Sequence, residues 1–424
     1  MTKSRTVAVT GLGLVTPLGN DVESTWNAIL NDESGVREIA GFDASGFPTR
    51  IAAEVKGLRA EGSLEDRKSL KYVTPFSLFA LVAAEEAVRD AGVRPTAATA
   101  ERWGLVSGSG MMTTEFEFLQ RFQREYAADG EIDLVRLGAE GARFISSPEF
   151  ARHHAVAGQA LLHKRYDIRG YSANLHTACA SGGQALGLAM RAVRSGQADF
   201  VLAGGYDTMI NPIGLAGFCL LGAISTDNDR PRSASRPFDL TRNGFVLGEG
   251  AGFMVLEDWQ RARDRGAKIY AEIAGEGNSL SSYRITDSPP SGDGPIQAIR
   301  SALTDAGESI DSIDYLNAHG TSTPMNDLSE TNAIKAVFGE RAYDLAVSST
   351  KSQMGHLIAA AGAVEGIICA LAIHRSTAPM TANLGTPDPA CDLDYVSDGC
   401  RQMRIDTALS NSFGFGGSNS CLVF

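Results

Sequence analysis

The chain has 424 residues, of which 43% are hydrophobic and 21% are charged, and its net charge is −12 at pH 7. This composition is typical of a globular protein that is large enough for two packed halves. The acidic balance argues against a broad surface for nucleic acid or for an anionic membrane. We find no strongly apolar run of membrane-spanning length and no signal-peptide core near the first residues, so we expect a cytoplasmic location.

Predicted strands and helices alternate along the chain. The first apolar strand, residues 6–10, precedes Gly11-Leu12-Gly13, but Thr16 stands where a dinucleotide-binding loop needs its third glycine, so we reject that interpretation. The alternation that follows predicts an α/β protein with mostly buried strands. We expect helices near residues 73–91, 258–265, 295–306 and 356–374, and strands near residues 103–107, 200–203, 252–257, 269–274, 315–318, 345–349, 394–396 and 407–412.

Two distant segments share a pattern in which a strand ends and a helix of small residues begins. One covers residues 177–183 and the other covers residues 349–362. This similarity predicts a duplicated fold with halves at residues 1–266 and 267–424. Close packing of two helices rich in alanine and glycine would produce the same pattern.

One of the six cysteines has the setting of a reactive group. Cys179 follows an extended run and precedes Ser181-Gly182-Gly183, which places it at the start of a helix. Free N–H groups and the helix dipole favour a thiolate there, so we expect a lowered pKa; the alternative is a buried thiol that fills a junction. We interpret the others as buried hydrophobes, because no pair has zinc-site spacing and a reducing compartment disfavours disulfides: Cys219, Cys369, Cys391, Cys400 and Cys421.

Two histidines lie at the ends of predicted strands. His319 is followed by hydroxyl residues and a proline, and His356 precedes a predicted helix. A lone histidine is more often structural, but two at matching strand ends, with a cysteine at a third, favour a catalytic site. The remaining histidines lack this setting: His153, His154, His163, His176 and His374.

A glycine-rich segment, residues 411–419, comes at the end of the last predicted strand. Its glycines would let backbone N–H groups approach a ligand closely, although a tight turn has the same composition.

Four segments occur in the order and approximate spacing of the β-ketoacyl-acyl-carrier-protein synthases: TACASG, NAHGTSTPMND, SSTKSQMGH and NSFGFGGSN. The chain resembles this family of thiolase-like condensing enzymes from Val7 to the last strand, and least between residues 112 and 174. The resemblance implies a five-layered αβαβα fold whose two halves are related by a pseudo-twofold axis. It also implies a dimer, an acidic acyl carrier protein as partner, no metal, and no cofactor except the phosphopantetheine that arrives on the carrier.

The resemblance implies a role for each of five catalytic residues. Cys179 looks like the nucleophile that accepts the acyl group. His319 and His356 match the pair that binds the malonyl thioester carbonyl and stabilises the enolate, for which two imidazole N–H groups suffice. Lys351 and Glu365 match the charged pair that orders the site.

Further positions match the family's gate, substrate contacts and carrier surface. Backbone N–H groups of Cys179 and Phe415 would form the oxyanion hole, and Phe415 resembles a gating aromatic with hinges at Gly414, Gly416 and Gly417. Asp327 and Glu330 match acidic positions that brace the histidine loop. A basic patch for the carrier is expected at Arg67, Lys68 and Lys71, unless these residues form an ordinary solvated helix face. The expected substrate contacts are Thr321, Thr323, Met111 and Phe413.

Several positions depart from the family pattern around the acyl pocket and the dimer contact. Met111 stands where relatives often have isoleucine, Ser281 and Arg284 replace an acidic residue and a histidine, and His153-His154 replaces an Asn-Met pair. These departures favour the ketosynthase subunit of a type II polyketide or polyene synthase, paired with a homologue that lacks the cysteine. The alternative is the homodimeric elongating synthase of type II fatty acid synthesis. A non-catalytic chain-length partner or a cysteine hydrolase fits poorly with Cys179 and two histidines.

Overall fold

Two β-sheets form the framework of the protein. The computed structural model describes residues 5–58, 67–110, 115–128 and 130–424. The six-stranded sheet has the order β10-β1-β9-β8-β4-β7, and the five-stranded sheet has the order β11-β17-β16-β12-β13. The strands of the first sheet are β1 (Val7–Val15), β4 (Trp103–Ser109), β7 (Ser172–Leu175), β8 (Phe200–Asp207), β9 (Gly250–Asp258) and β10 (Ala271–Glu272). The strands of the second are β11 (Gly275–Leu280), β12 (Tyr315–Asn317), β13 (Ala346–Ser348), β16 (Ala408–Phe413) and β17 (Ser418–Val423).

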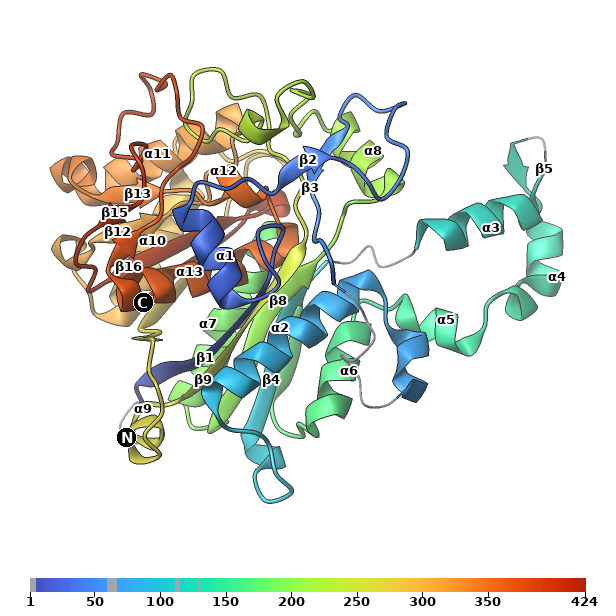
Figure 1. Ribbon diagram of the computed structural model, residues 1–424, viewed down its shortest axis with the longest axis horizontal. Coiled ribbons are helices and arrows are strands. Elements are labelled where there is room, and N and C mark those ends of the chain that lie inside the picture. The colour runs from blue at the N-terminus through green and yellow to red at the C-terminus, as the bar shows by residue number, and fades with distance from the viewer. Residues whose placement is uncertain (1–4, 59–66, 111–114, 129) are drawn as a thin grey trace.

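Helices cover both outer faces and fill the space between the sheets (Figure 1). One outer layer holds α2 (Pro75–Ala91) and α6 (Ala157–Tyr166). The middle layer holds α7 (Ser181–Arg194) and α13 (Ala361–Arg375), and the far layer holds α10 (Asp293–Ala306) and α11 (Pro324–Phe338). The architecture is therefore the five-layered αβαβα arrangement of the thiolase-like fold.

Shorter elements complete the described chain. The small two-stranded sheets are β2 (Val36–Glu38) with β3 (Ile51–Ala53), β5 (Ala127–Ala128) with β6 (Glu131–Ile132), and β14 (Thr377–Ala378) with β15 (Arg401–Gln402). The additional helices are α1 (Val22–Leu30), α3 (Phe116–Tyr126), α4 (Leu134–Phe144), α5 (Ser147–Arg152), α8 (Pro212–Leu220), α9 (Trp259–Asp264) and α12 (Lys351–Met354). The segment from α3 to α5, which we call the arm, projects away from the body (Figure 1).

The two glycines near the N-terminus lie inside β1 and not in a loop. A Cβ atom on Gly11 or Gly13 would collide with backbone atoms of α2, so glycine is needed for this helix to lie so close to the strand. The Gly-Leu-Gly sequence thus reflects close packing of the strand against α2. This agrees with the conclusion that the segment is not a dinucleotide-binding loop.

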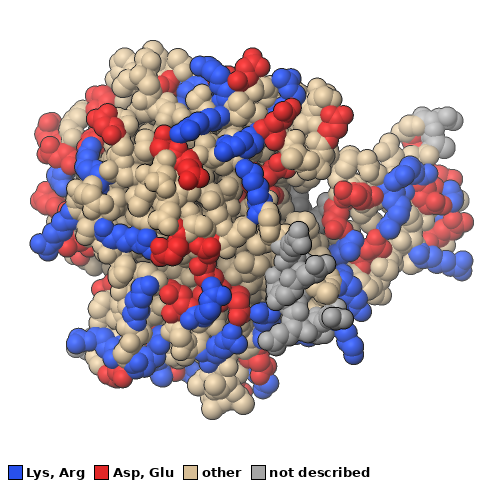
Figure 2. All heavy atoms as spheres, viewed as in Figure 1, with Lys and Arg blue, Asp and Glu red and all other residues tan. Residues whose placement is uncertain are grey.

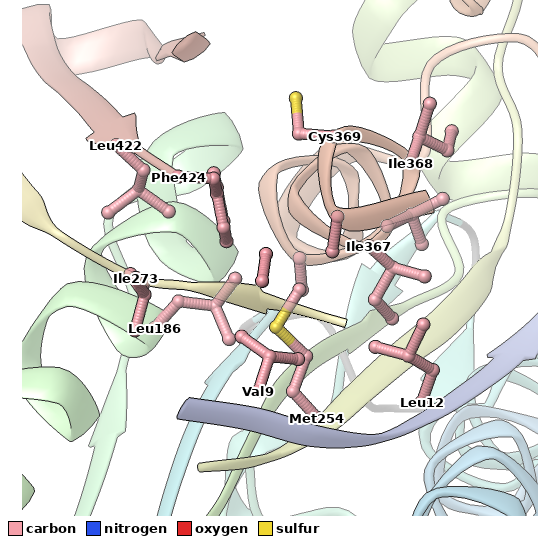
Figure 3. Packing of buried hydrophobic residues seen from close by; sticks show 14 of the residues in the cluster. Val9, Leu12, Leu186, Met254, Ile273, Ile367, Ile368, Cys369, Leu422 and Phe424 are labelled. Atoms are coloured by element: carbon pink, nitrogen blue, oxygen red, sulfur yellow. The ribbon is translucent and has the colours of Figure 1, made fainter. Parts of the chain in front are cut away.

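The main core lies between the first sheet and the middle helices. Figure 3 shows Val9 and Leu12 of β1, Met254 of β9 and Ile367 of α13 packed together, and all four side chains are fully buried. The stretch 358–375 is long and apolar enough to span a membrane by length and composition, and 83% of it is buried inside the protein. Burial on all sides explains its apolar composition.

The middle helices approach each other through glycine, which positions the two segments that precede them. A Cβ atom on Gly182 of α7 would lie 2.7 Å from Ala363 N, and one on Gly362 would lie 2.6 Å from Gly183 N. Short 3₁₀ turns, Ala178–Ala180 and Ile358–Ala360, precede these helices and contact each other. The repeated small-residue pattern therefore brings two distant turns side by side.

Two predicted elements differ from the observed ones. Residues 394–396 form no strand, because Val396 has φ of 49° and the Tyr395 ring stacks on Phe238 at 3.8 Å. The helix expected from residue 356 begins at Ala361, since the His356 N–H donates to Val246 O and the next residues form the 3₁₀ turn. The division at residue 266 stays a prediction.

Candidate active site

Cys179 lies in a strained turn between β7 and α7. The preceding residue, Ala178, has a left-handed φ of 51°. The Ser181 hydroxyl holds the turn, accepting from Thr177 N at 2.8 Å and donating to Ala178 O at 2.7 Å. This geometry presents the sulfur at the end of the first sheet, just before the helix begins.

His356 contacts the sulfur directly. Its Nε2 lies 3.0 Å from Cys179 Sγ, and its Nδ1 accepts from Ile358 N at 3.3 Å. Because Nδ1 accepts, the neutral ring carries its proton on Nε2, which points at the sulfur. The ring can therefore donate a hydrogen bond to an oxygen bound at this position.

His319 reaches the same point from the loop after β12. Glu330 holds this loop by accepting from the backbone N–H groups of His319 and Gly320, each at 2.8 Å. The His319 ring lies 5.2 Å from the His356 ring in an edge-on arrangement. One ligand atom from each of Cys179, His319 and His356 lies within 4.8 Å of the others, so the structure brings the three predicted side chains together.

Burial and a nearby cation keep both histidines neutral. Desolvation lowers the pKa of His319 and of His356 well below the ordinary value, and the positive charge of Lys351 lowers both further. Lys351 is itself buried and forms an ion pair with Glu365. Burial raises the pKa of Glu365 to about 7, although the Lys351 charge opposes this rise.

The predicted lowering of the Cys179 pKa is wrong. Burial raises the pKa of the Cys179 thiol to about 12, and the opposing effects of Lys351 and of the Phe415 N–H are too weak to reverse this. Desolvation exceeds the helix-end effect because the thiol is almost entirely removed from water. The thiol is therefore neutral at pH 7, and its proton must leave as the sulfur attacks.

Two cavities meet at Cys179 and Phe415. The outer cavity has a volume of about 250 Å³ and is lined by both histidines, Thr321, Thr323, Phe413, Gly414 and Gly417. The inner cavity has a volume of about 450 Å³, a mostly apolar wall, and Gly416 in its lining. Phe415 lies between the two, next to Gly416 and Gly417 with positive φ of 78° and 82°.

Of the remaining predicted residues, the described substrate contacts lie at the outer cavity and the two lysines lie on the surface. The Thr321 and Thr323 hydroxyls lie 2.9 Å apart at the outer cavity, and the Phe413 ring lies 5.7 Å from the His319 ring. Lys68 and Lys71 are exposed on a 3₁₀ helix, Arg67–Tyr72, and line neither cavity. Met111 and the Arg67 side chain lie outside the described residues.

Two polar residues of the inner cavity were not predicted from the sequence. His176, which lacks the sequence setting of the two catalytic histidines, and Asp207 both line it. His176 stands only three residues before Cys179, which is the signal that could have identified it. Asp207 had no such signal, because it approaches the cysteine from a different strand.

The three side chains that meet at the site are also of types that can bind a metal ion. By distance alone, Cys179, His319 and His356 could hold a metal ion. A cation there would face the Lys351 charge, which acts on all three groups, and the sulfur and the His356 nitrogen already contact each other at 3.0 Å. The donor set is thus better suited to hydrogen bonding than to a metal.

The chain matches two sequence families along most of its length. The β-ketoacyl synthase N-terminal domain matches residues 4–262, and the β-ketoacyl synthase C-terminal domain matches residues 270–385. The chain is 44% identical to a 3-oxoacyl-[acyl-carrier-protein] synthase 2 of Coxiella burnetii, over 99% of this chain and 98% of that protein. It is 40% identical to the protein of the same name from Synechocystis, over 100% and 98% of the two chains.

Solved structures give the same result. A type II PKS ketosynthase, described as AntDE:AntF with its acyl-carrier protein and a hexaketide, superposes with a TM-score of 0.88, 35% identity and 99% coverage of both chains. A β-ketoacyl synthase from Burkholderia phymatum superposes with a TM-score of 0.89, 33% identity and the same coverage. The chain therefore belongs to the β-ketoacyl synthase family, the condensing acyltransferases of the thiolase-like fold.

Proposed function

We propose that the protein extends an acyl chain held on Cys179 by decarboxylative condensation with malonyl-acyl carrier protein. The observation that supports this most directly is the meeting of one thiol and two neutral imidazoles where the cavities join. A cysteine hydrolase needs one histidine base, whereas a second imidazole N–H is useful for an enolate oxygen.

The first half-reaction transfers the acyl group. The Cys179 sulfur attacks the thioester carbonyl of the acyl-pantetheine, and the backbone N–H groups of Cys179 and Phe415 stabilise the oxyanion. The carbon–sulfur bond to pantetheine breaks, and the thiol proton leaves with the pantetheine sulfur. The acyl chain then occupies the inner cavity.

The second half-reaction forms the carbon–carbon bond. The malonyl carboxylate leaves as carbon dioxide, and its bonding electron pair forms an enolate whose oxygen accepts from His319 and His356. The enolate carbon attacks the Cys179 thioester carbonyl, and the sulfur departs with the electron pair of its bond to carbon. Lys351, paired with Glu365, keeps both histidines neutral and able to donate.

The pathway that the comparisons support better is fatty acid elongation. The similar curated proteins are named 3-oxoacyl-[acyl-carrier-protein] synthase 2, at up to 44% identity, so they support the fatty-acid alternative over the polyketide interpretation favoured by the sequence. Polyketide synthesis remains the second candidate because a solved type II PKS ketosynthase is 35% identical over the whole chain. We propose a cytoplasmic enzyme without a metal or resident cofactor.

We further propose that Arg67, Lys68 and Lys71 contact the acidic carrier and that the enzyme is a homodimer. Strand β7 ends the first sheet and leaves one edge without a neighbouring strand among the described residues. The arm exposes large apolar side chains at Leu134 and Val135. An unpaired strand edge and an exposed apolar surface are both suited to contact with a second, similar chain.

The test is acylation followed by condensation. Incubated with acyl-carrier thioester, the protein should gain the mass of one acyl group, and Cys179→Ala should gain none. Normal acylation of Cys179→Ala would refute the mechanism, and loss of activity on metal chelation would refute its metal independence. Elongation of saturated chains by the protein alone supports the fatty-acid pathway, whereas a requirement for a homologue without the cysteine supports the polyketide pathway.

A further inference from the structure

The wall of the inner cavity carries two polar side chains at the ends of neighbouring strands. Strand β4 lies between β7 and β8, and both run parallel to it. His176 follows the end of β7, Asp207 ends β8, and Ser109-Gly110 lies at the end of β4 between them. Because parallel strands end at the same edge, both side chains contact the same dipeptide in a wall otherwise formed largely by apolar groups such as Met209, Phe218 and Ile358.

His176 presents a hydrogen-bond acceptor. Its Nδ1 lies 2.8 Å from Ser109 O. A carbonyl oxygen can only accept, so Nδ1 carries the proton and Nε2 of the neutral ring is an acceptor. Within the part of the chain that the structure describes, this Nε2 has no hydrogen-bond partner, and the residue lines the cavity.

Asp207 presents a carboxyl oxygen without a partner. Its Oδ2 accepts from Ala359 N at 3.0 Å, whereas its Oδ1 is buried and has no partner among the described residues. A Cβ atom on Gly110 would collide with this Oδ1, so the oxygen packs against Gly110, and both residues line the cavity. Burial, with a smaller contribution from Glu249, raises the pKa of Asp207 to about 7, so a large fraction is protonated near neutral pH and Oδ1 can donate.

We propose that His176 Nε2 and Asp207 Oδ1 form a polar subsite that selects an acyl chain carrying a hydroxyl group. Such a hydroxyl donates to His176 and accepts from Asp207, which satisfies both groups at once. A fully reduced chain leaves both without a partner, and a keto oxygen engages only Asp207. The inference rests on the proposed function, because it requires the acyl chain on Cys179 to occupy the inner cavity.

The test compares acyl-pantetheine thioesters of equal length, one saturated and the others with a single hydroxyl moved along the chain. Acylation of the wild-type protein is followed by intact mass without malonyl substrate. We expect one hydroxyl position to raise kcat/KM about tenfold over the saturated chain, as a satisfied hydrogen-bond pair would. Equal rates for all chains would overturn the subsite, while failure of every chain to acylate Cys179 would instead refute the proposed function.

Variants locate the selectivity. The ratio of hydroxylated to saturated rates, taken within each variant, should fall to about one in His176→Ala and be partly restored in His176→Gln, whose amide oxygen accepts. Asp207→Asn should retain part of the ratio, since its amide can accept from Ala359 and still donate. The matched control is His374→Ala, at the end of α13 and away from the cavity. An unchanged ratio in His176→Ala overturns the proposal, and if that variant does not fold, the wild-type series decides alone.

Discussion

At the residue scale, one buried ammonium group organises the chemistry of the site. Burial lowers the pKa of both histidines, Lys351 lowers it further, and the pairing of Lys351 with Glu365 compensates the burial of the ammonium group. The histidines therefore remain neutral, with an N–H on His356 directed at Cys179. Donors that are fixed before the reaction stabilise a developing oxyanion without reorganisation.

The two histidines should differ in their contribution to the half-reactions. His319→Ala should still become acylated but lose malonyl decarboxylation by roughly 10²-fold or more, because one of two enolate donors is gone. His356→Ala should slow both steps, since this ring also contacts the sulfur. Intact mass measures acylation, and release of labelled carbon dioxide measures decarboxylation; identical defects in both variants would contradict the division.

Buried carboxyls should make stability depend on pH. Burial raises the pKa of five carboxyls to about 7 each: Glu86, Asp207, Glu249, Glu330 and Glu365. The folded state then binds protons below pH 7 that the unfolded state binds only near pH 4, so this stabilisation is present at low pH and lost as pH rises through 7. The free energy of unfolding should rise by on the order of 1 kcal/mol from pH 8 to pH 7.

Urea denaturation at the two pH values checks this rise. Glu249→Gln should reduce the difference by about a fifth, since it removes one of the five titrating carboxyls. The lowered pKa values of His319 and His356 act in the opposite sense, so the gain in stability with falling pH should be smaller below pH 6.5 than the carboxyls alone would give. Stability that fell between pH 8 and pH 7 would show that these carboxyls are ionised in the folded protein.

At the element scale, the contact between α7 and α13 decides where the reactive groups lie. Each helix begins just after a turn that holds a site residue, and glycines let the helix axes approach. The sequence pattern of small residues suggested either a duplicated fold or close packing of two helices. Both interpretations apply here, because the two similar segments lead into helices that pack closely against each other. Separation of the helices would move Cys179 away from His356.

Substitution of Gly362 should expose this constraint. In Gly362→Ala the new Cβ would lie 2.6 Å from Gly183 N, and the helices must move apart. We expect a loss of about 1–3 kcal/mol in the free energy of unfolding together with slower acylation. The control is Gly138→Ala on exposed α4, where nothing lies within 4 Å of the new Cβ and stability should rise by up to about 1 kcal/mol. Equal effects of the two substitutions would contradict the packing argument.

At the scale of the whole molecule, shape is more informative than charge. Positive and negative side chains are interspersed over the face shown in Figure 2, without a broad field of one sign. The arm, in contrast, departs from the compact body (Figure 1) and exposes Leu134 by 73%, Val135 by 85% and Phe150 by 60%. Such apolar exposure supports the proposed contact with a second chain.

Charges placed on the arm should disrupt the proposed dimer. The double variant Leu134→Asp, Val135→Asp should shift the native mass from dimer towards monomer, because burying two carboxylates costs several kcal/mol. Native mass spectrometry or light scattering measures the change. The control is Leu240→Asp, which changes another exposed leucine that lies on the body and not on the arm. It should leave the native mass unchanged. A monomeric wild-type protein, or a dimer that tolerates the charged arm, would refute this interface.

Local patterns in the sequence determined the elements, the motifs and the identity of the reactive groups. Runs of apolar residues predicted most strands, and the sequence alone places Cys179, His319 and His356 at the ends of predicted strands. Such features are readable because hydrophobic period, glycine and helix starts depend on neighbours in the chain.

Only the tertiary structure decided the electrostatics and the cavity walls. Desolvation depends on segments far apart in sequence, so the raised pKa of Cys179 contradicted an argument based on its local helix alone. The pairing of β7, β4 and β8 brought His176 and Asp207 to one cavity, and no spacing along the chain encodes that contact. The sequence thus specifies which groups are available, whereas sheet order and burial specify which of them meet and in what protonation state.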